Sequence, residues 1–526
     1  MEGTTVARDP EDQKFPQIDE DKLPEPQGFN LRALNNSTGS ESYDESYKDA
    51  GSKIINRLKT WGVESRGQVP RPWIYPVPLE HRTDPQFSKS FFVWLSSNLN
   101  ILSFSEGTVG VLVYGLTFRQ AAGVIVGFNL LSALPPAYFS TFGPKLGLRQ
   151  MVQARYSFGY VNHSACSAND DSIRGSWFGA IIPGAFNLLV MMGYNILNAI
   201  LAGQTLSVVS GGKMSWNVGI VIISLISLLI SFFGYRILNW YERVAWFPVM
   251  IMYLVVLGIG GRHLTSSNEE QALAPARSVL SYGATVAAFI ISYAALMSDY
   301  TNYMRVDVPS WKVCLFSYLG LLLPTASVQL IGAAFAASLR SNPTWQAGYE
   351  AAGPGGLVDA ILSPAKGFGK FLTVLLALSG PTLYSFSISS QVVLPFSARM
   401  PRYAFSIAGT GILIPLAIVG STRFEETLVD FLGLVGYWSS TFIAVVAIEH
   451  VVFRKGDWCA YDTSCWNTPG KLPPGIAAIG ACVCSFGLIV PCMDQVWFTG
   501  PIARTTGDIG FEVGGVRWSD KVLIIM

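Results

Sequence analysis

The chain has 526 residues, of which 50% are hydrophobic and 13% are charged, and its formal net charge is +1. Soluble proteins carry about 25% charged residues, so most of this surface is expected to face something other than water. The balanced charge gives no reason to expect a nucleic-acid partner, and the seven cysteines form no metal-binding pattern.

The N-terminal segment is polar and rich in Pro, Asp, Glu and Ser, which is typical of a disordered tail. It contains no apolar run of the signal-peptide kind, so we expect it to stay in the cytosol. We therefore predict a disordered cytosolic tail at 1–88, a membrane-embedded core at 89–497 and a truncated C-terminal tail at 498–526.

From Phe91 onward, apolar runs recur at the length of about 20 residues with which a helix spans a bilayer. The eleven runs cover 91–116, 118–140, 179–208, 216–235, 244–261, 279–298, 314–338, 368–394, 403–420, 427–448 and 474–497. The sequence thus predicts an all-α integral membrane protein. Lys and Arg are more frequent in the connections that are cytosolic when the N-terminus lies inside, as the positive-inside rule requires.

Two of the eleven runs contain polar groups that an ordinary membrane helix does not carry. The first run includes "NLNILSFSEGTVG", from Asn98 to Gly110, and the sixth includes "SYAALMSDYTNYM", from Ser292 to Met304. Transporters built from inverted repeats place a broken helix in each repeat and hold the substrate between the breaks. The five-run spacing predicts this fold, with two inverted repeats of five helices.

Several stretches resemble the fungal purine–cytosine permeases of the nucleobase–cation symporter-1 family, in the order found in that family. They are "FFVWLSSNLNILSFSEGTVG", "GPKLGLRQMVQARYSFGY", "ILNAILAGQTLSVVS", "MSWNVGIVIISLISLLISFFGYRILNWYERVAW", "SYAALMSDYTNYM", "GYWSSTFIAVVAIEHVVFRKGDW" and "GPIARTTGDIGFE", within residues 82–512. The resemblance implies twelve helices, two inverted five-helix repeats followed by two more. It also implies inward transport of neutral nucleobases with a cation, which is a proton in the fungal group.

A neutral planar base needs aromatic rings for its faces and groups that donate and accept hydrogen bonds for its edge. Tyr194 and Asn198 lie four residues apart, so they share a helix face. The resemblance places a ring and an amide or acid at these positions. We expect Tyr194 to stack on the base and Asn198 to bond its edge; the alternative is that both only join helices.

The other expected substrate contacts come from the two interrupted runs. Phe289, Ser292 and Tyr293 surround the predicted break in the sixth run, where an aromatic ring would cover the second face of the base. Ser103 and Ser105 are the polar candidates in the first run, beside backbone groups that a break would free.

Carboxylates inside a membrane are expensive and therefore indicate function. Glu106 and Asp299 are the candidates for proton coupling, because a carboxylate that gains and loses a proton can link uptake to the proton gradient. The alternative for both is a helix end in contact with water, and it is stronger for Asp299, which lies near the cytosolic end of the sixth run. Glu449 and His450 are expected to form a surface ion pair.

The chain departs from the family pattern in three places. Residues 161–177 form a hydrophilic insert that we interpret as a retained intron. The eighth run has only Pro381 where the family has an Asn-Asn-x-Pro element. The C-terminus is too short and too polar for a twelfth helix.

The sequence therefore predicts a proton-coupled symporter that imports cytosine and purines across the plasma membrane by alternating access. The lipid bilayer, a nucleobase and a proton are its expected partners, with no cofactor, metal or nucleic acid. The four histidines have no paired acid or nucleophile nearby, which argues against an enzyme. The alternatives are a vitamin carrier for pyridoxine or thiamine, an allantoin or hydantoin carrier, or a sensor or paralogue that does not transport.

Overall fold

The computed structural model describes residues 76–159, 178–232, 234–264, 273–379, 386–387, 389–390, 402–466, 468 and 471–509. Most of the predicted tail, the 161–177 insert and Pro381 lie outside these residues. All described residues belong to one compact unit. They are helical, apart from loops and one antiparallel strand pair, β1 (Asp494–Gln495) and β2 (Phe498–Thr499).

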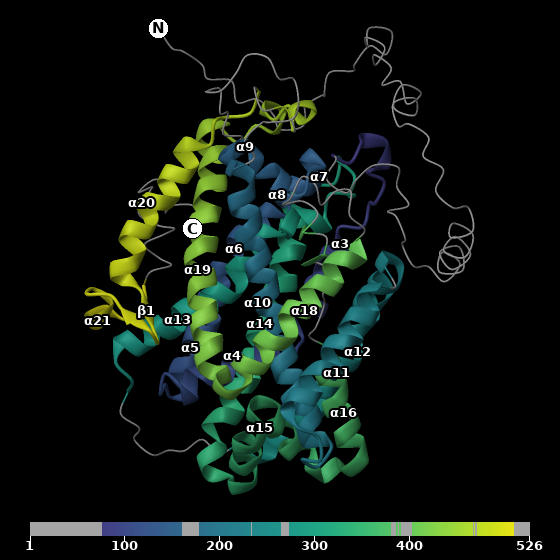
Figure 1. Cartoon of the computed structure of the whole chain (residues 1–526), viewed down its shortest axis with the longest axis vertical. Helices are drawn as coiled ribbons and strands as arrows, with labels where there is room; N and C mark the ends of the chain where they lie inside the picture. The colour runs from purple at the N-terminus through teal and green to yellow at the C-terminus, as the bar shows by residue number, and fades with distance from the viewer. Residues whose placement is uncertain are drawn as a thin grey trace, which may run out of the picture. The chain divides into compact units, whose positions relative to one another are not determined.

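The order of the helices along the chain agrees with the order of the predicted apolar runs (Figure 1). They are α3 (Ser88–Asn98), α4 (Ile101–Leu112), α5 (Phe118–Ser132), α6 (Leu134–Phe139), α7 (Phe142–Leu146), α8 (Gln150–Gln153), α9 (Arg155–Phe158), α10 (Phe178–Val209), α11 (Trp216–Phe232), α12 (Gly234–Gly260), α13 (Ala276–Ile291), α14 (Ser310–Ala337), α15 (Pro343–Leu362), α16 (Lys366–Leu378), α18 (Arg402–Gly420), α19 (Phe424–Ile448), α20 (Ile476–Cys492) and α21 (Ala503–Thr506). Short helical turns, η5 (Ser292–Ala295), η6 (Met297–Tyr300) and the π-helical η11 (Glu449–Phe453), join some of them.

Every predicted apolar run contains a helix in the described part of the chain. Seven helical stretches there are long and apolar enough to cross a membrane by length and composition. This number is below eleven because α18 and α19 count as one stretch and because three apolar helices are shorter than a full span. Helix α15, between the seventh and eighth runs, was not predicted. It bends at Ala352 and Gly353, whose backbone is non-helical.

The predicted break in the first run is confirmed. Helix α3 ends at Asn98, Leu99 and Asn100 have non-helical backbone, and α4 begins at Ile101. The Asn100 side chain caps α4, because its Oδ1 accepts the amide hydrogen of Ser103 at 2.9 Å. The Asn100 carbonyl freed by the break accepts a hydrogen bond from the Tyr253 hydroxyl at 2.7 Å.

The predicted break in the sixth run is confirmed as well. Helix α13 ends at Ile291 and continues as two separate turns of 3₁₀ helix, η5 and η6. Leu296 lies between these turns with φ of −129° and ψ of −10°. Polar groups of the first and sixth runs therefore mark interrupted helices.

Helices α4 and α14 approach each other closely at two glycines. A Cβ atom added at Gly107 would lie 2.0 Å from the Gln329 carbonyl oxygen, and one added at Gly332 would lie 2.1 Å from the Phe104 carbonyl oxygen. Helix α14 also packs along α3 and α5, while α10 packs against α11, α15 and α18. Small residues permit such contacts between membrane helices.

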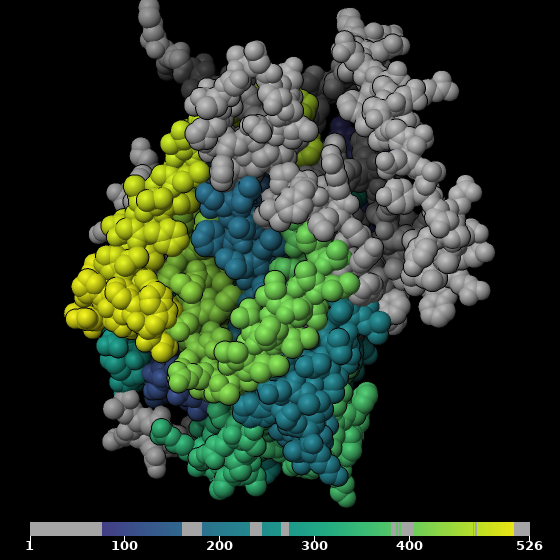
Figure 2. Space-filling view, viewed as in Figure 1, coloured from purple at the N-terminus to yellow at the C-terminus, as the bar shows by residue number. Residues whose placement is uncertain are grey.

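Apolar side chains cover the outside of several helices. In Figure 2, α18 crosses one face diagonally and α20 lies beside it, with parts of α19 and α10 visible between them. On these helices Ile412 is 51% exposed, Val419 75% and Val483 67%. Such exposed apolar side chains are unusual on a monomer in water and are expected for helices in lipid.

The segment that precedes α3 contacts the ends of two spans. The Arg82 guanidinium donates to four carbonyl oxygens, those of Val77 at 2.8 Å, Pro144 at 3.2 Å, Lys145 at 3.3 Å and Leu146 at 2.9 Å. Burial lowers the pKa of Arg82 to about 10. The amide of Asp84 donates to the Tyr303 carbonyl at 3.2 Å. The segment thus contacts both the end of α7 and the loop that follows η6.

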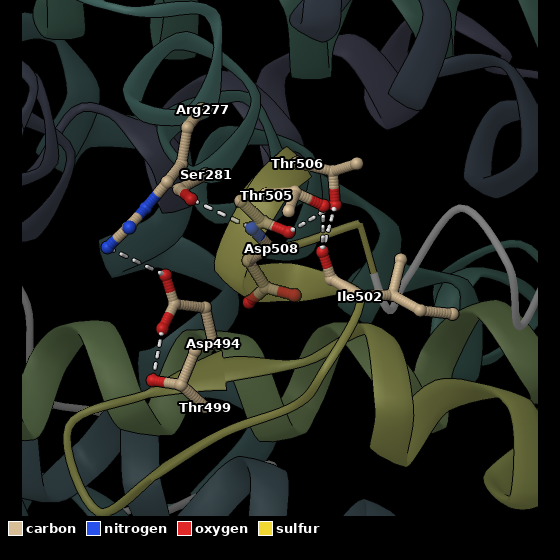
Figure 3. Close-up of polar contacts among 9 residues, drawn as sticks. Arg277, Ser281, Asp494, Thr499, Ile502, Thr505, Thr506 and Asp508 are labelled. Carbon is tan, nitrogen blue, oxygen red and sulfur yellow. Dashed lines mark hydrogen bonds and ion pairs between the residues drawn. The ribbon is translucent and has the colours of Figure 1, made fainter.

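The segment after α20 folds back onto the start of α13 (Figure 3). The Asp508 amide donates to Ser281 Oγ at 2.8 Å, and an Arg277 guanidinium nitrogen lies 3.8 Å from Asp494 Oδ2. Gly507 has φ of +86°, and a Cβ added there would lie 2.3 Å from the Arg277 carbonyl oxygen. The first part of the predicted C-terminal tail, to residue 509, is therefore packed against the helices.

Candidate functional site

Four of the predicted substrate contacts meet in one aromatic cluster. The rings of Tyr194 on α10 and Tyr293 on η5 are nearly parallel, with an interplanar angle of 5° and centroids 6.3 Å apart. Phe289 meets Tyr194 edge-on at 5.7 Å. The Tyr194 hydroxyl shares a 2.9 Å hydrogen bond with Ser292 Oγ. The break in the sixth run therefore lies directly against α10.

Two further aromatic residues complete this cluster, and our sequence reasoning did not include them. Trp94 on α3 contacts Tyr293 with ring centroids 5.2 Å apart, and Phe431 on α19 contacts Tyr194 edge-on at 5.2 Å. A Cβ added at Gly193 would lie 1.9 Å from the Phe431 ring, so this glycine makes room for it. Trp94 lies about one turn before the first break, a position that a search for rings near both breaks would have found.

Asn198 lies one turn beyond Tyr194 on α10 and is buried. Its Nδ2 donates to the Tyr194 carbonyl at 2.9 Å, while its Oδ1 is buried and has no hydrogen-bond partner in the described part of the chain. A buried polar atom without a partner is rare in folded proteins and calls for an explanation. The side chain is therefore held in place by one end and offers a free acceptor at the other.

Ser103 and Ser105 lie on α4 immediately after the first break. Both hydroxyls are buried and have no hydrogen-bond partner among the residues that the structure describes. Helix α4 packs against α10. Within the described residues, however, neither serine side chain forms a hydrogen bond with the aromatic cluster. They form a second group of unsatisfied polar atoms, on a different helix from Asn198.

The two candidate carboxylates have different surroundings. Glu106 is fully buried; its Oε2 accepts a hydrogen bond from Gln329 Nε2 at 2.6 Å, and its Oε1 has no hydrogen-bond partner within the described residues. Asp299 on η6 is bound at the start of α8, where it lies 3.3 Å from an Arg149 nitrogen and accepts the Gln150 amide hydrogen at 2.7 Å. Asp299 therefore takes part in an ion pair that joins two short helices.

The expected ion pair between Glu449 and His450 is wrong. Glu449 pairs with Arg454 at 2.9 Å, whereas His450 is buried among aromatic rings and contacts Trp458 at 4.3 Å and Phe142 at 5.0 Å. Adjacent residues of a helix do not face each other, so Glu449 and His450 point to different sides of η11. Among the described residues, no group of three or more His, Cys, Asp or Glu side chains is placed to hold a metal ion.

Known proteins of similar sequence are permeases. A family model described as a permease for cytosine/purines, uracil, thiamine and allantoin matches residues 76–514. Purine-cytosine permease fcyB of Emericella nidulans is 33% identical over 482 residues, which cover 89% of each chain. Purine-cytosine permease FCY2 of Saccharomyces cerevisiae is 32% identical over 459 residues, covering 84% of this chain and 82% of that protein. The vitamin B6 transporter TPN1 of the same yeast is 29% identical over 423 residues, covering 77% and 69%.

Solved structures of Mhp1, a nucleobase-cation-symport-1 family transporter, have the same fold. Its closed conformation with bromovinylhydantoin bound superimposes with a TM-score of 0.59 at 14% identity, over 84% of this chain and 92% of Mhp1. Its inward-facing conformation gives a TM-score of 0.60 at 15% identity, over 86% and 92%. These matches confirm the predicted all-α membrane transporter fold.

The relatives are permeases and transporters, which agrees with the prediction that the chain is not an enzyme. The family match covers most of the sequence, including both helix breaks and the aromatic cluster. The chain is therefore a multi-pass membrane transporter and belongs to the family of permeases for cytosine/purines, uracil, thiamine and allantoin.

Proposed function

We propose that this chain imports cytosine and purine nucleobases across the plasma membrane by alternating access, coupled to proton entry, with its N-terminus in the cytosol. The observation that carries the proposal is the aromatic cluster of Tyr194, Phe289 and Tyr293 beside the unpartnered Oδ1 of Asn198. Rings suit the faces of a base, and a neutral acceptor suits the donors on its edge.

The distance between the parallel rings supports a site that opens and closes. Their planes are separated by no more than the centroid distance of 6.3 Å. A base stacked between two rings needs about 7 Å, since each carbon–carbon contact takes roughly 3.5 Å. Tyr194 and Tyr293 therefore have to separate by at least about 0.7 Å before a base enters between them.

Glu106 is the proposed proton-coupling group. Its carboxyl is fully buried, and in the described part of the chain it has no ion-pair partner. An unpaired charge is costly in such a place, so protonation and deprotonation change the local free energy strongly. Asp299, the second candidate, is compensated by Arg149, which makes it the weaker one.

A vitamin carrier is the second proposal, because the vitamin B6 transporter TPN1 is 29% identical to this chain. This chain has a tyrosine at position 194, and it does not have the asparagines that precede the equivalent of Pro381 in the purine–cytosine permeases. Both positions are expected to contact the substrate, so these differences should affect which ring is bound. The remaining alternatives are an allantoin or hydantoin carrier and a paralogue without transport activity, and the same uptake experiment distinguishes them.

The test is uptake by yeast that lacks its own base permease and expresses this chain. Radiolabelled cytosine, adenine, pyridoxine and allantoin are compared at two external pH values, with a fluorescent tag to confirm that the protein reaches the plasma membrane. We expect saturable cytosine and adenine uptake that is faster at the lower pH. Pyridoxine or allantoin uptake without cytosine uptake would support the other carriers. No uptake of any of them by correctly located protein would contradict transport.

A further inference from the structure

A chain of buried amide side chains leads from Glu106 to the backbone of a neighbouring helix. Gln329 Nε2, on α14, donates to Glu106 Oε2 at 2.6 Å. Gln329 Oε1 in turn accepts a hydrogen bond from Asn129 Nδ2, on α5, at 2.6 Å. All three side chains have no exposed surface, so water does not compete for these bonds.

The backbone fixes the direction of this chain. Asn129 Nδ2 also donates to the Ile125 carbonyl at 2.7 Å, and a carbonyl only accepts. Turning the Asn129 amide over would place its Oδ1 against the Ile125 carbonyl oxygen, two acceptors, and turning only the Gln329 amide would place its Nε2 against Asn129 Nδ2, two donors. Gln329 therefore always presents its donor to Glu106, and Glu106 Oε2 always accepts.

The other carboxyl oxygen of Glu106 has no such restraint. Oε1 is buried and has no hydrogen-bond partner among the described residues. The ionisable side chains that interact electrostatically with the Glu106 carboxyl from the described helices around it are tyrosines: Tyr194 from α10, Tyr282 from α13, whose hydroxyl also bonds the Glu106 carbonyl at 3.3 Å, and Tyr293 from η5. On α15, Tyr349 bonds Glu425. Helices α14 and α5 contribute the two amides.

We infer that Gln329 and Asn129 are positioning residues for proton coupling, which leave Glu106 Oε1 as the atom that binds and releases the proton. This inference rests on the proposed proton-coupled transport. On the outer side a hydronium ion gives one proton to Oε1 and becomes water. On the inner side the O–H bond breaks and the proton passes back to water. In both states Oε2 keeps its bond to Gln329.

The test measures cytosine uptake against external pH for the wild type and for Gln329→Met, in the full-length chain. Methionine has nearly the same length and no donor. Losing the donor disfavours the carboxylate, so Glu106 keeps its proton at higher pH. The loss of a hydrogen bond to a charged group should raise the external pH at which uptake is half-maximal by about one unit. Asn129→Leu, which frees the Gln329 amide to turn over, should shift it in the same direction by less.

Thr325→Val is the matched control. Thr325 is also on α14, about one turn from Gln329, and its hydroxyl is buried without a partner. Uptake by this variant should be half-maximal at the same external pH as in the wild type. If Gln329→Met and Asn129→Leu both reach the plasma membrane and their uptake is also half-maximal at the wild-type pH, the inference is overturned while proton coupling stands. If wild-type uptake itself ignores pH, the proposed coupling fails instead. If Gln329→Met does not reach the membrane, Asn129→Leu decides by the same criterion.

Discussion

Tyr194 combines a ring that is suited to stacking with a hydroxyl that fixes the orientation of the ring. The hydroxyl bonds Ser292 Oγ at 2.9 Å and donates to the Phe289 carbonyl at 3.3 Å. These bonds hold the ring parallel to Tyr293. The ring should therefore contribute most of the affinity for a base, while the hydroxyl contributes the orientation.

Replacing Tyr194 separates these two contributions. Tyr194→Ala removes a stacking surface worth roughly 1–3 kcal/mol per base, so the KM for cytosine should rise about 5- to 100-fold. Tyr194→Phe keeps the ring and loses one hydrogen bond, so its KM should rise only a few-fold. Uptake kinetics corrected for the amount of protein at the cell surface measure both. Equal losses in the two variants would show that stacking is not the role of this ring.

Asn198 can be compared with Asn195 on the same helix. Both side chains are buried, and each donates to the carbonyl four residues earlier, at 2.9 Å and 2.8 Å. The Oδ1 of Asn198 is left without a partner. Asn198→Ala should raise the KM for cytosine roughly 2- to 10-fold, the value of one hydrogen bond. Asn195→Ala should leave the KM unchanged. Equal kinetics in both variants would remove Asn198 from the site.

At the scale of helices, one glycine and one asparagine shape the first span. Gly107 lets α4 lie against the α14 backbone, next to the Gln329 that bonds Glu106. Asn100 ends the extended link between α3 and α4 by capping the second helix. Packing and capping together place Ser103, Ser105 and Glu106 on the same short helix.

A methyl group at Gly107 should disturb the contact between α4 and α14. Its Cβ would lie 2.0 Å from a backbone oxygen, so the helices must move apart. Overpacking of this kind costs about 1–3 kcal/mol. Gly107→Ala should therefore lower the melting temperature of the purified protein. Gly123→Ala on α5, where no atom lies within 4 Å of an added Cβ, is the control and should melt at the wild-type temperature or slightly above. Identical melting of both variants would refute the close approach.

The cap of α4 can be tested in the same way. Asn100→Ala loses the acceptor for the Ser103 amide, which costs about 1 kcal/mol. Asn100→Ser keeps a hydroxyl acceptor at the cap, so it should melt closer to the wild type than Asn100→Ala does. Thermal unfolding followed by tryptophan fluorescence distinguishes them. A serine variant that melts no higher than the alanine variant would argue against the cap.

For the whole molecule, the sequence predicted the helices and both breaks, because lipid requires long apolar runs and polar groups stand out within them. Helix α15 was not predicted, since its "AAGPGG" stretch contains glycine and proline that ordinarily end a helix. Trp94 and Phe431 were missed because their contact with the site depends on how distant helices pack. Fold comparison confirmed the architecture, and the site residues stay a proposal.

Glu106 and the aromatic cluster belong to different broken helices of the molecule. Glu106 lies on the helix that follows the first break, while the aromatic cluster is built around the second break. In the proposed mechanism, a proton on Glu106 and a base between the rings therefore act on the two broken helices that such transporters use to alternate. The proposed coupling requires the protonation of this carboxyl to differ between the outward-facing and inward-facing states.

Transport by the purified chain in lipid vesicles tests this coupling most directly. Labelled cytosine is added outside at an acidic external pH, with the membrane potential clamped at zero, while a trapped dye reports the internal pH. We predict that the wild type accumulates cytosine above its external concentration and acidifies the interior in step, whereas Glu106→Gln, present in equal amount, does neither. Accumulation by the wild type without proton entry, or unchanged proton-driven accumulation by Glu106→Gln, would contradict the account.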